Sequence, residues 1–128
     1  MKERQEELLF IAAILGFLAV AFGAFGSHAL KDMLSESGQH QYDLGVRYAF
    51  IHVLALLATT LAMPLAGKPK HLNLAAWFFI SGIVLFSGSL ILLALSHIAF
   101  FAVITPLGGL GFLLGWFYFA YGIRSSRG

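Results

Sequence analysis

Long apolar stretches separated by short polar segments dominate the chain, and they predict helices that cross a membrane. The first uncharged stretch covers residues 8–30, about 34 Å of α-helix, which is enough to span a bilayer. One uncharged block, residues 72–123, is too long for a single span and must turn back once. The pattern therefore predicts an all-α polytopic membrane protein: one transmembrane domain over residues 1–128, built as a bundle of four transmembrane helices. The expected spans are residues 8–30, 48–65, 72–95 and 106–123.

The turn inside the long apolar block falls between Ser96 and Pro106. Thr105 followed by Pro106 is typical of a helix start, because threonine caps the amino end and proline loses no hydrogen bond at the first helical position. We therefore expect the fourth helix to start at Thr105 and Pro106, with residues 98–104 as an interfacial or re-entrant segment. The alternative is a helix from Ile98 that is kinked at Pro106, with neighbouring helices satisfying the freed backbone groups.

Residues 31–47 form the one sizeable hydrophilic connection. Ser35 is a candidate helix cap, since Glu36 would then lie in the first turn, where a negative charge suits the helix dipole. The second helix can thus begin well before the membrane. With the spans given above, no Asp, Glu, Lys or Arg lies inside the membrane, which disfavours a proton-coupled transporter.

Composition agrees with a membrane location. The 128 residues are 59% hydrophobic and 11% charged, whereas an ordinary globular domain is about 25% charged. The net charge of +2 makes no basic face for nucleic acid, since Lys and Arg lie in the gaps between apolar stretches. The chain has no cysteine, which excludes disulfides, thiolate metal sites and cysteine nucleophiles.

The distribution of Lys and Arg predicts an orientation. With four spans, the basic residues of the amino terminus, of the connection at Lys68 and Lys70, and of the carboxyl tail share one side. Only Lys31 and Arg47 lie on the other side. The positive-inside rule then predicts an inner (cell) membrane protein with both termini in the cytoplasm.

Small residues punctuate the predicted spans. Because lipid gives no hydrophobic reward for joining helices, close approach over small residues is a main source of helix association. We expect packing contacts at seven glycines: Gly16, Gly23, Gly26, Gly88, Gly108, Gly111 and Gly115. Packing within one bundle is the favoured interpretation, and contacts in a homo-oligomer or along a ligand groove are the alternatives.

Three histidines, His28, His52 and His97, fall near the outer ends of the predicted spans, at one membrane depth. We favour local hydrogen bonding there and expect no cofactor. The alternative is a haem held by His28 and His52, or a metal held by all three histidines. Arg47 and Tyr48 stand at the outer mouth of the second span, where they could hold a lipid headgroup or anchor the helix at the interface.

Three segments carry a resemblance to a known family: Gly23 to Leu30, then Gly45-Val46-Arg47-Tyr48 leading through His52 to Leu57, and finally Ser87 to Leu90 followed by Ile104 to Gly109. The chain resembles, over nearly its whole length, the YgdD-type family of small bacterial inner-membrane proteins of unknown function. That resemblance implies four transmembrane helices and no established activity. His28, Arg47, Tyr48, His52, Thr105 and Pro106 match its pattern, whereas His97 lies outside it and Ser27 stands where alanine is more usual.

We expect a non-catalytic module that binds membrane lipid, a small hydrophobic ligand or a partner membrane protein through His28, Arg47, Tyr48 and His52. No Gly-rich phosphate loop, nucleophile elbow or zincin motif occurs in the sequence, so we expect no enzymatic activity. Two alternatives stay open: a histidine-ligated cofactor protein, and an oligomeric permeation or transport component.

Overall fold

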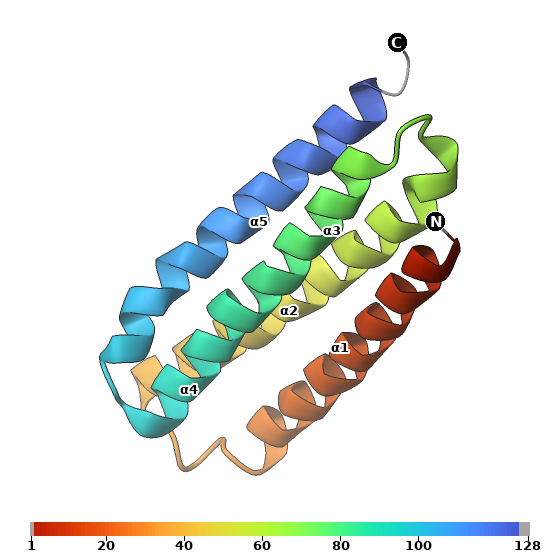
Figure 1. Cartoon of the computed structure of the whole chain (residues 1–128). Helices are drawn as coiled ribbons and strands as arrows, with labels where there is room; N and C mark the ends of the chain where they lie inside the picture. Colours follow the sequence, from red (N-terminus) through yellow and green to blue (C-terminus); the bar gives the residue numbers. More distant parts are fainter. Residues whose placement is uncertain (1, 126–128) are drawn as a thin grey trace.

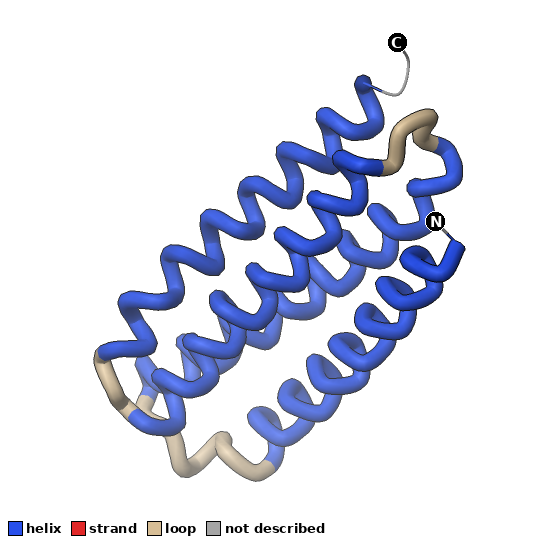
Figure 2. Tube along the Cα trace, viewed as in Figure 1, coloured by secondary structure: helices blue, strands red, loops and turns tan. Residues whose placement is uncertain are grey.

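The computed structural model describes residues 2–125, which are helices joined by short connections and include no strand (Figures 1 and 2). Helix α1 covers Lys2–His28, and α2 covers Glu36–Ala62 and continues into the short 3-10 helix η1, Met63–Leu65. The third run joins α3 (Lys70–Gly82), the π-helical turn η2 (Ile83–Ser87) and α4 (Gly88–Ser96) without a break. Helix α5 covers Phe100–Ser125. Four runs are long and apolar enough to cross a membrane, so the predicted all-α, four-helix membrane bundle is confirmed.

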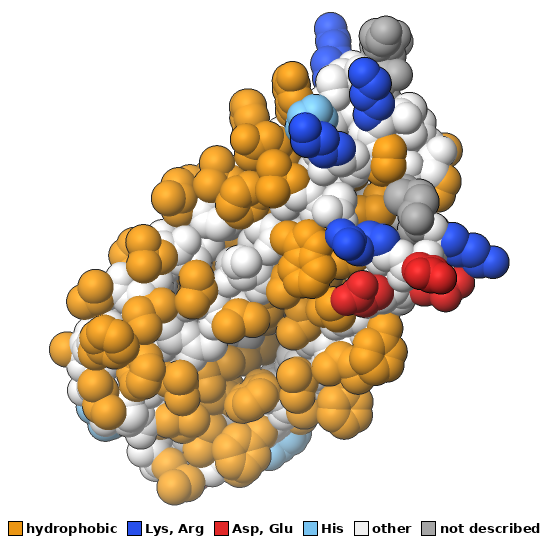
Figure 3. Space-filling view, in the orientation of Figure 1, with side chains coloured by type: hydrophobic (Ala, Val, Ile, Leu, Met, Phe, Trp, Pro, Cys, Tyr) orange, Lys and Arg blue, Asp and Glu red, His pale blue; other side chains and the backbone are white. Residues whose placement is uncertain are grey.

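Each of the four helical runs packs against only some of the others. Helix α1 lies against α2, α2 also lies against α3 and α4, and α5 packs mainly along α3 and η2 (Figure 1). The two ends of the chain lie at the same end of the bundle (Figure 1). On the face drawn in Figure 3, Lys and Arg gather at that end, and hydrophobic side chains cover the remaining length.

Helix α1 attaches to the bundle by one narrow stripe. Its buried residues, Leu8, Ala12, Ala19 and Gly26, recur at intervals of four or seven and so lie on one side of the helix. The opposite side is strongly apolar and exposed, with Phe10 at 66% and Phe17 at 71%. Such a surface suits lipid and not water, because large contiguous apolar patches are rare on soluble proteins.

Helix α2 begins twelve residues before the predicted span of 48–65, which agrees with the expectation that this helix can begin well before the membrane. Ser35 is its N-cap, accepting a hydrogen bond from the Gly38 backbone N–H at 3.0 Å, as expected from the sequence. The polar residues in the first part of α2 occupy the outward side of the helix. The other side of the helix packs on α1 and α4. As a result Asp43 and Arg47 lie on the same helix as the predicted span, in the part that precedes residue 48.

The fourth helix does not start at Thr105 and Pro106, and residues 98–104 are not re-entrant. Helix α5 starts at Phe100, with Pro106 inside it, so the alternative of a continuous helix is the correct one. The turn is a short one centred on His97, whose left-handed backbone (φ 61°) ends α4. The physical reason lies in the apolar surroundings, where an unwound segment would leave backbone groups unsatisfied. Next to the proline, the Thr105 hydroxyl donates to the Phe101 carbonyl at 3.0 Å.

The glycines differ in what they permit. A methyl group at Gly26 would overlap the Tyr42 ring, one at Gly108 would overlap the Phe86 backbone, and one at Gly115 would overlap the Phe79 ring. The remaining predicted glycines, Gly16, Gly23 and Gly111, leave 3.3 to 3.6 Å to their neighbours. Gly88 contradicts the prediction of a packing contact, because an added Cβ there would meet nothing within 4 Å. It borders a recess, described below.

Candidate functional site

His52 sits in an aromatic cluster between α2 and α5 and is only 4% exposed. Its ring stacks on Phe112 with centroids 3.6 Å apart and an interplanar angle of 8°. One ring nitrogen, Nδ1, lies 2.8 Å from the Tyr48 carbonyl, and the other, Nε2, lies 3.0 Å from Trp116 Nε1. The side chain therefore bridges two helices through its ring and both nitrogens.

The two hydrogen bonds of His52 fix its tautomer. An indole N–H only donates, so Nε2 accepts from Trp116. Nδ1 must then carry the proton and donate it to the Tyr48 carbonyl. Every polar atom of the ring is satisfied within the chain, which is the condition a buried histidine needs in lipid.

The three histidines do not share one depth, and that expectation was wrong. Val53, next to His52, lies beside Gly16 in the middle of α1, whereas His28 ends α1 twelve residues later, about 18 Å along the axis. His97 forms the turn at the end of α4. The error follows from the late start given to the second span, which moved His52 toward the surface.

The predicted cluster of His28, Arg47, Tyr48 and His52 separates into three places. Tyr48 stays with His52, with ring centroids 5.8 Å apart. Arg47 points outward from α2, and His28 is exposed at the end of α1. No group of three or more His, Asp or Glu side chains among residues 2–125 is placed to hold a metal ion. A haem or metal bound to His52 would have to use Nε2, and Trp116 would have to give up its hydrogen bond.

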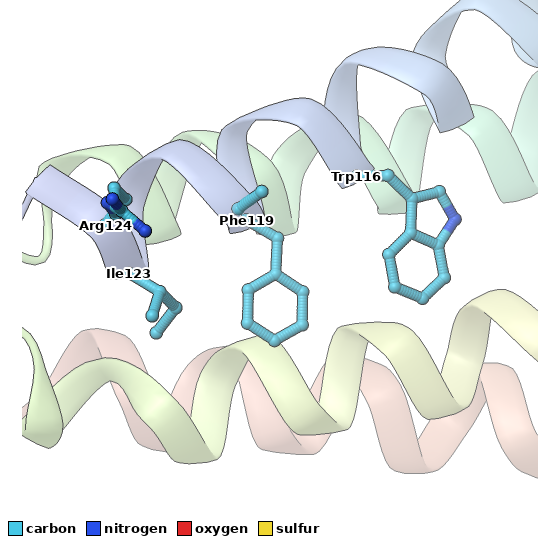
Figure 4. Close-up of a pocket in the computed structure, with 5 residues that line it drawn as sticks. Trp116, Phe119, Ile123 and Arg124 are labelled. Atoms are coloured by element: carbon cyan, nitrogen blue, oxygen red, sulfur yellow. The ribbon is translucent and has the colours of Figure 1, made fainter.

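Two recesses open beside this cluster along α5. The larger, about 860 Å³, is an open groove lined by Trp116, Phe119, Ala120, Ile123 and Arg124. Figure 4 shows the Trp116, Phe119 and Ile123 side chains pointing from α5 toward α2. The smaller lies at Tyr48 and His52 and shares Trp116 with it. Apart from Arg124 at one end, the residues that line the larger groove are apolar or aromatic. Such a lining is typical of the lipid-facing surface of a membrane protein.

A different recess, between α1 and η2, has the features of a binding site. It encloses about 220 Å³ and is bounded by three elements: Leu15, Leu18, Ala19 and Phe22 of α1, Val46 and Ala49 of α2, and Ile83, Val84, Ser87, Gly88 and Ile91 of the third run. We call this space the α1–η2 cavity. It forms because α1 packs on α2 and leaves the third run free on that side.

Ser87 is the unusual residue of the α1–η2 cavity. It is 3% exposed, and its hydroxyl has no hydrogen-bond partner among the described residues. The other fully buried polar residues, His52, Thr59, Thr60 and Ser89, each have one. Two partly buried side chains, Gln39 and His71, also carry one buried atom without a partner, and neither lines this cavity. A buried hydroxyl without a partner costs about 1–3 kcal/mol, so Ser87 is held at a price in stability.

The local backbone explains why this hydroxyl stands out. Residues 83–87 form a π-helical turn, and such single-turn insertions in α-helices are frequent at functional sites. Gly88 follows directly and leaves bare backbone at the cavity wall. From the sequence, Gly88 was expected only as a packing residue, and Ser87 had no expected role. The residues around Ser87 and Gly88 do not reveal a π turn in the sequence. They do not reveal the cavity either, because the cavity depends on where α1 lies.

The fold defines a polytopic membrane protein, and the α1–η2 cavity is an apolar recess between its helices. Comparison with known proteins gives the family: residues 22–109 match the family described as "Protein of unknown function (DUF423)", and the chain belongs to it. The resemblance inferred from the sequence is thereby confirmed.

Relatives from distant bacteria match over most of their length. The chain is 40% identical to the UPF0382 inner membrane protein YgdD of Escherichia coli K12, over 94% of this chain and 92% of the relative. It is 37% identical to a UPF0382 membrane protein of Haemophilus influenzae, over 96% of this chain and 98% of the relative. It is 38% identical to the UPF0382 membrane protein YwdK of Bacillus subtilis, over 84% and 88%. No solved structure matches the chain significantly.

Proposed function

We propose that this protein is a non-catalytic inner-membrane module that binds an uncharged hydrophobic molecule carrying one hydrogen-bonding oxygen in the α1–η2 cavity. The observation that carries the proposal is Ser87, a residue that lines this apolar space and whose buried hydroxyl has no hydrogen-bond partner among the described residues, so that a small rotation toward the cavity would let it pair with a ligand. A carbonyl or hydroxyl oxygen of a ligand would remove the cost of that unpaired group. The volume, about 220 Å³, suits a ring or a short chain, since an apolar cavity of about 150 Å³ holds benzene.

The depth of Ser87 narrows the ligand class. Ser87 lies nine residues before the end of α4, which places it about 14 Å inside that end of the bundle. Half the hydrocarbon core of a bilayer is about 15 Å, so a hydroxyl at this depth lies within the hydrocarbon region and not among the headgroups. The ester carbonyls of a phospholipid stay near the headgroups and do not reach it. A lipophilic ketone, quinone or long-chain alcohol, whose oxygen can enter the hydrocarbon, is the class that fits.

We also propose an orientation of the bundle in the membrane. On the face drawn in Figure 3, the basic residues concentrate at the end of the bundle where α1 starts and α5 ends. The relative from Escherichia coli K12 is named an inner membrane protein. By the positive-inside rule that end faces the cytoplasm. The α1–η2 cavity then opens sideways to lipid, so a ligand would enter from the membrane and need not pass through water.

Benzophenone tests the proposal, because it is an apolar ketone that cross-links to its surroundings under light. In purified protein reconstituted in vesicles, labelling should concentrate on peptides that line the α1–η2 cavity. Benzhydrol, which replaces the ketone by a hydroxyl, should compete about as well. Diphenylmethane has the same shape without oxygen and should compete about fivefold less well, which corresponds to one hydrogen bond of about 1 kcal/mol.

Two variants and one control complete this test. Gly88→Leu fills the cavity without clashing, because the space beside Gly88 is free, and it should abolish site labelling. Ser87→Ala should remove the preference for the oxygen-bearing competitors. Gly109→Leu is the matched control, because Gly109 has room and lies outside this cavity. Labelling spread evenly over lipid-facing residues, or unchanged in Gly88→Leu, would contradict the proposal.

A further inference from the structure

One side of α2 carries charged residues that face outward. The exposed residues Glu36, His40, Asp43, Arg47, Phe50 and Leu54 follow one another in steps of four, three, four, three and four. Steps of this kind place them on one face of the helix, with the spacing of a coiled-coil seam. We call this face the outward stripe of α2. Its first part is charged or polar, and its second part, from Phe50 onward, is apolar.

The charged part of the outward stripe lies alongside the last turns of α1. Arg47 follows Val46, which lies beside Gly23 of α1, five residues before that helix ends. Asp43 follows Tyr42, whose ring covers Gly26 and whose hydroxyl donates to the Phe22 carbonyl. Arg47 thus lies about 8 Å inside the end of α1, in a part of that helix that has no charged residue.

Neither charge forms an ion pair among the described residues. The one ion pair among the described residues joins Arg4 to Glu7 at the other end of the bundle. Asp43 accepts a single hydrogen bond, from Gln39, and Arg47 makes none. A charged side chain facing lipid costs about 2.5–3.5 kcal/mol at the bilayer centre and less toward the interface. A partner that brings both signs of charge would remove this cost.

The charge order identifies such a partner. Asp43 and Arg47 stand one turn apart on the same stripe, with opposite signs. An anionic headgroup would suit Arg47 but would be repelled by Asp43. A second copy of the same stripe, running parallel around a two-fold axis, brings Asp43 within one helical turn of the partner's Arg47, and Arg47 within one turn of the partner's Asp43, so that the two long side chains can pair diagonally. The two pairs form a set of four charges with no net charge.

We infer that the outward stripe of α2 is a homodimer interface, closed by two reciprocal contacts between Asp43 of one protomer and Arg47 of its partner. The apolar part of the stripe continues the seam. Leu54 is 64% exposed and Leu61 is 60% exposed, and the small Ala58 between them lets two helices approach closely. The α1–η2 cavity lies on another face, so the dimer leaves the proposed ligand site accessible.

Charge exchange tests the dimer directly. Asp43→Arg places four positive charges at the seam, and Arg47→Asp places four negative charges there, so each variant alone should lose about tenfold in dimer affinity, about 1.4 kcal/mol. A mixture of the two variants should form heterodimers, because every contact then joins opposite signs. The double variant Asp43→Arg/Arg47→Asp should dimerise with itself.

The absence of native cysteine makes the readout clear. Leu54→Cys, placed on the stripe in every protein above, should form an oxidative cross-link in native membranes, with two chain lengths marking heterodimers. Phe17→Cys on the lipid face of α1 is the matched position that should not cross-link. Glu3→Arg and Arg124→Asp, which change charge by the same amounts elsewhere, should leave cross-linking unaffected. No cross-link in the otherwise unchanged chain, or a loss in both single variants that neither the mixture nor the double variant restores, would overturn the interface.

Discussion

At the scale of single residues, His52 shows how a polar side chain is stabilised deep in lipid. Trp116 donates to Nε2, and the ring is packed on Phe112. We predict that Trp116→Phe lowers the free energy of unfolding by about 1–3 kcal/mol, because it leaves a buried acceptor without a donor. The measurement is reversible unfolding in mixed micelles, followed by circular dichroism.

The double-mutant cycle separates this hydrogen bond from lost packing. In a His52→Leu background the acceptor is gone, so Trp116→Phe should cost clearly less there than in the parent. Trp77→Phe on the partly exposed face of α3 is the matched control and should change stability by about 0.5 kcal/mol or less. An equal loss in both backgrounds would show that Trp116 acts through its size alone.

The sequence indicated His52 as an important residue but not its role. Its chemistry was visible, since histidine in an apolar helix needs a partner. The partner could not be predicted, because Trp116 is 64 residues away and the pairing depends on how α5 leans toward α2. Ser87 is the opposite case. Serine is ordinary in a transmembrane helix, and only its position in space shows that its hydroxyl is unpaired.

At the scale of elements, α5 shows why an apparent helix start became a helix interior. Thr105 donates to Phe101, and its oxygen lies 2.6 Å from the Ser89 hydroxyl of α4. This link supports the helix beside Pro106. We predict that Thr105→Val costs about 0.6–1.7 kcal/mol, the range of hydrogen bonds between membrane helices, and that Thr105→Ser costs at most a few tenths. Unfolding in micelles measures both.

A cycle with Ser89→Ala checks that the contact between helices, and not the shape of threonine, is responsible. The loss caused by Thr105→Val should shrink when Ser89 is already alanine. Additive losses would mean that the two hydroxyls act independently. Local sequence could not decide this element, because Thr-Pro is compatible with a start and with an interior, and the membrane environment selects the interior.

At the scale of the whole molecule, the sequence was sufficient for the fold class and insufficient for the boundaries. The uncharged stretches fix four crossings, because backbone groups in lipid must be satisfied within helices. The predicted span of 48–65 leaves out the first twelve residues of α2. This part of the helix is polar on one side, so its average composition does not indicate a membrane span. The depth of His52 in the bundle was therefore predicted wrongly. His28, His52 and His97 were expected at one depth, whereas the bundle separates them.

Orientation is a property of the whole molecule and follows from its charge asymmetry. Lys2, Arg4, Lys68, Lys70 and Arg124 belong to one end, and Lys31 and Arg47 belong to the other. We predict that the turn after α4 faces outward and that the end of α5 faces the cytoplasm. In a cysteine-free chain, Ile98→Cys should therefore react with a membrane-impermeant maleimide in intact cells, because Ile98 is 53% exposed in that turn.

Ser125→Cys should react only after the cells are permeabilised, because Ser125 ends α5 at the basic end. The inverse pattern would reverse the orientation, and labelling of both positions in intact cells would mean a mixed population. The same result bears on the dimer. The outward stripe has its charged part toward the turn end of the bundle, so a two-fold axis along the membrane normal requires all copies to share one orientation. A mixed population would leave half of the stripes facing antiparallel partners, in which the charged parts of the two stripes lie near opposite membrane surfaces, so that Asp43 and Arg47 of the two copies do not meet.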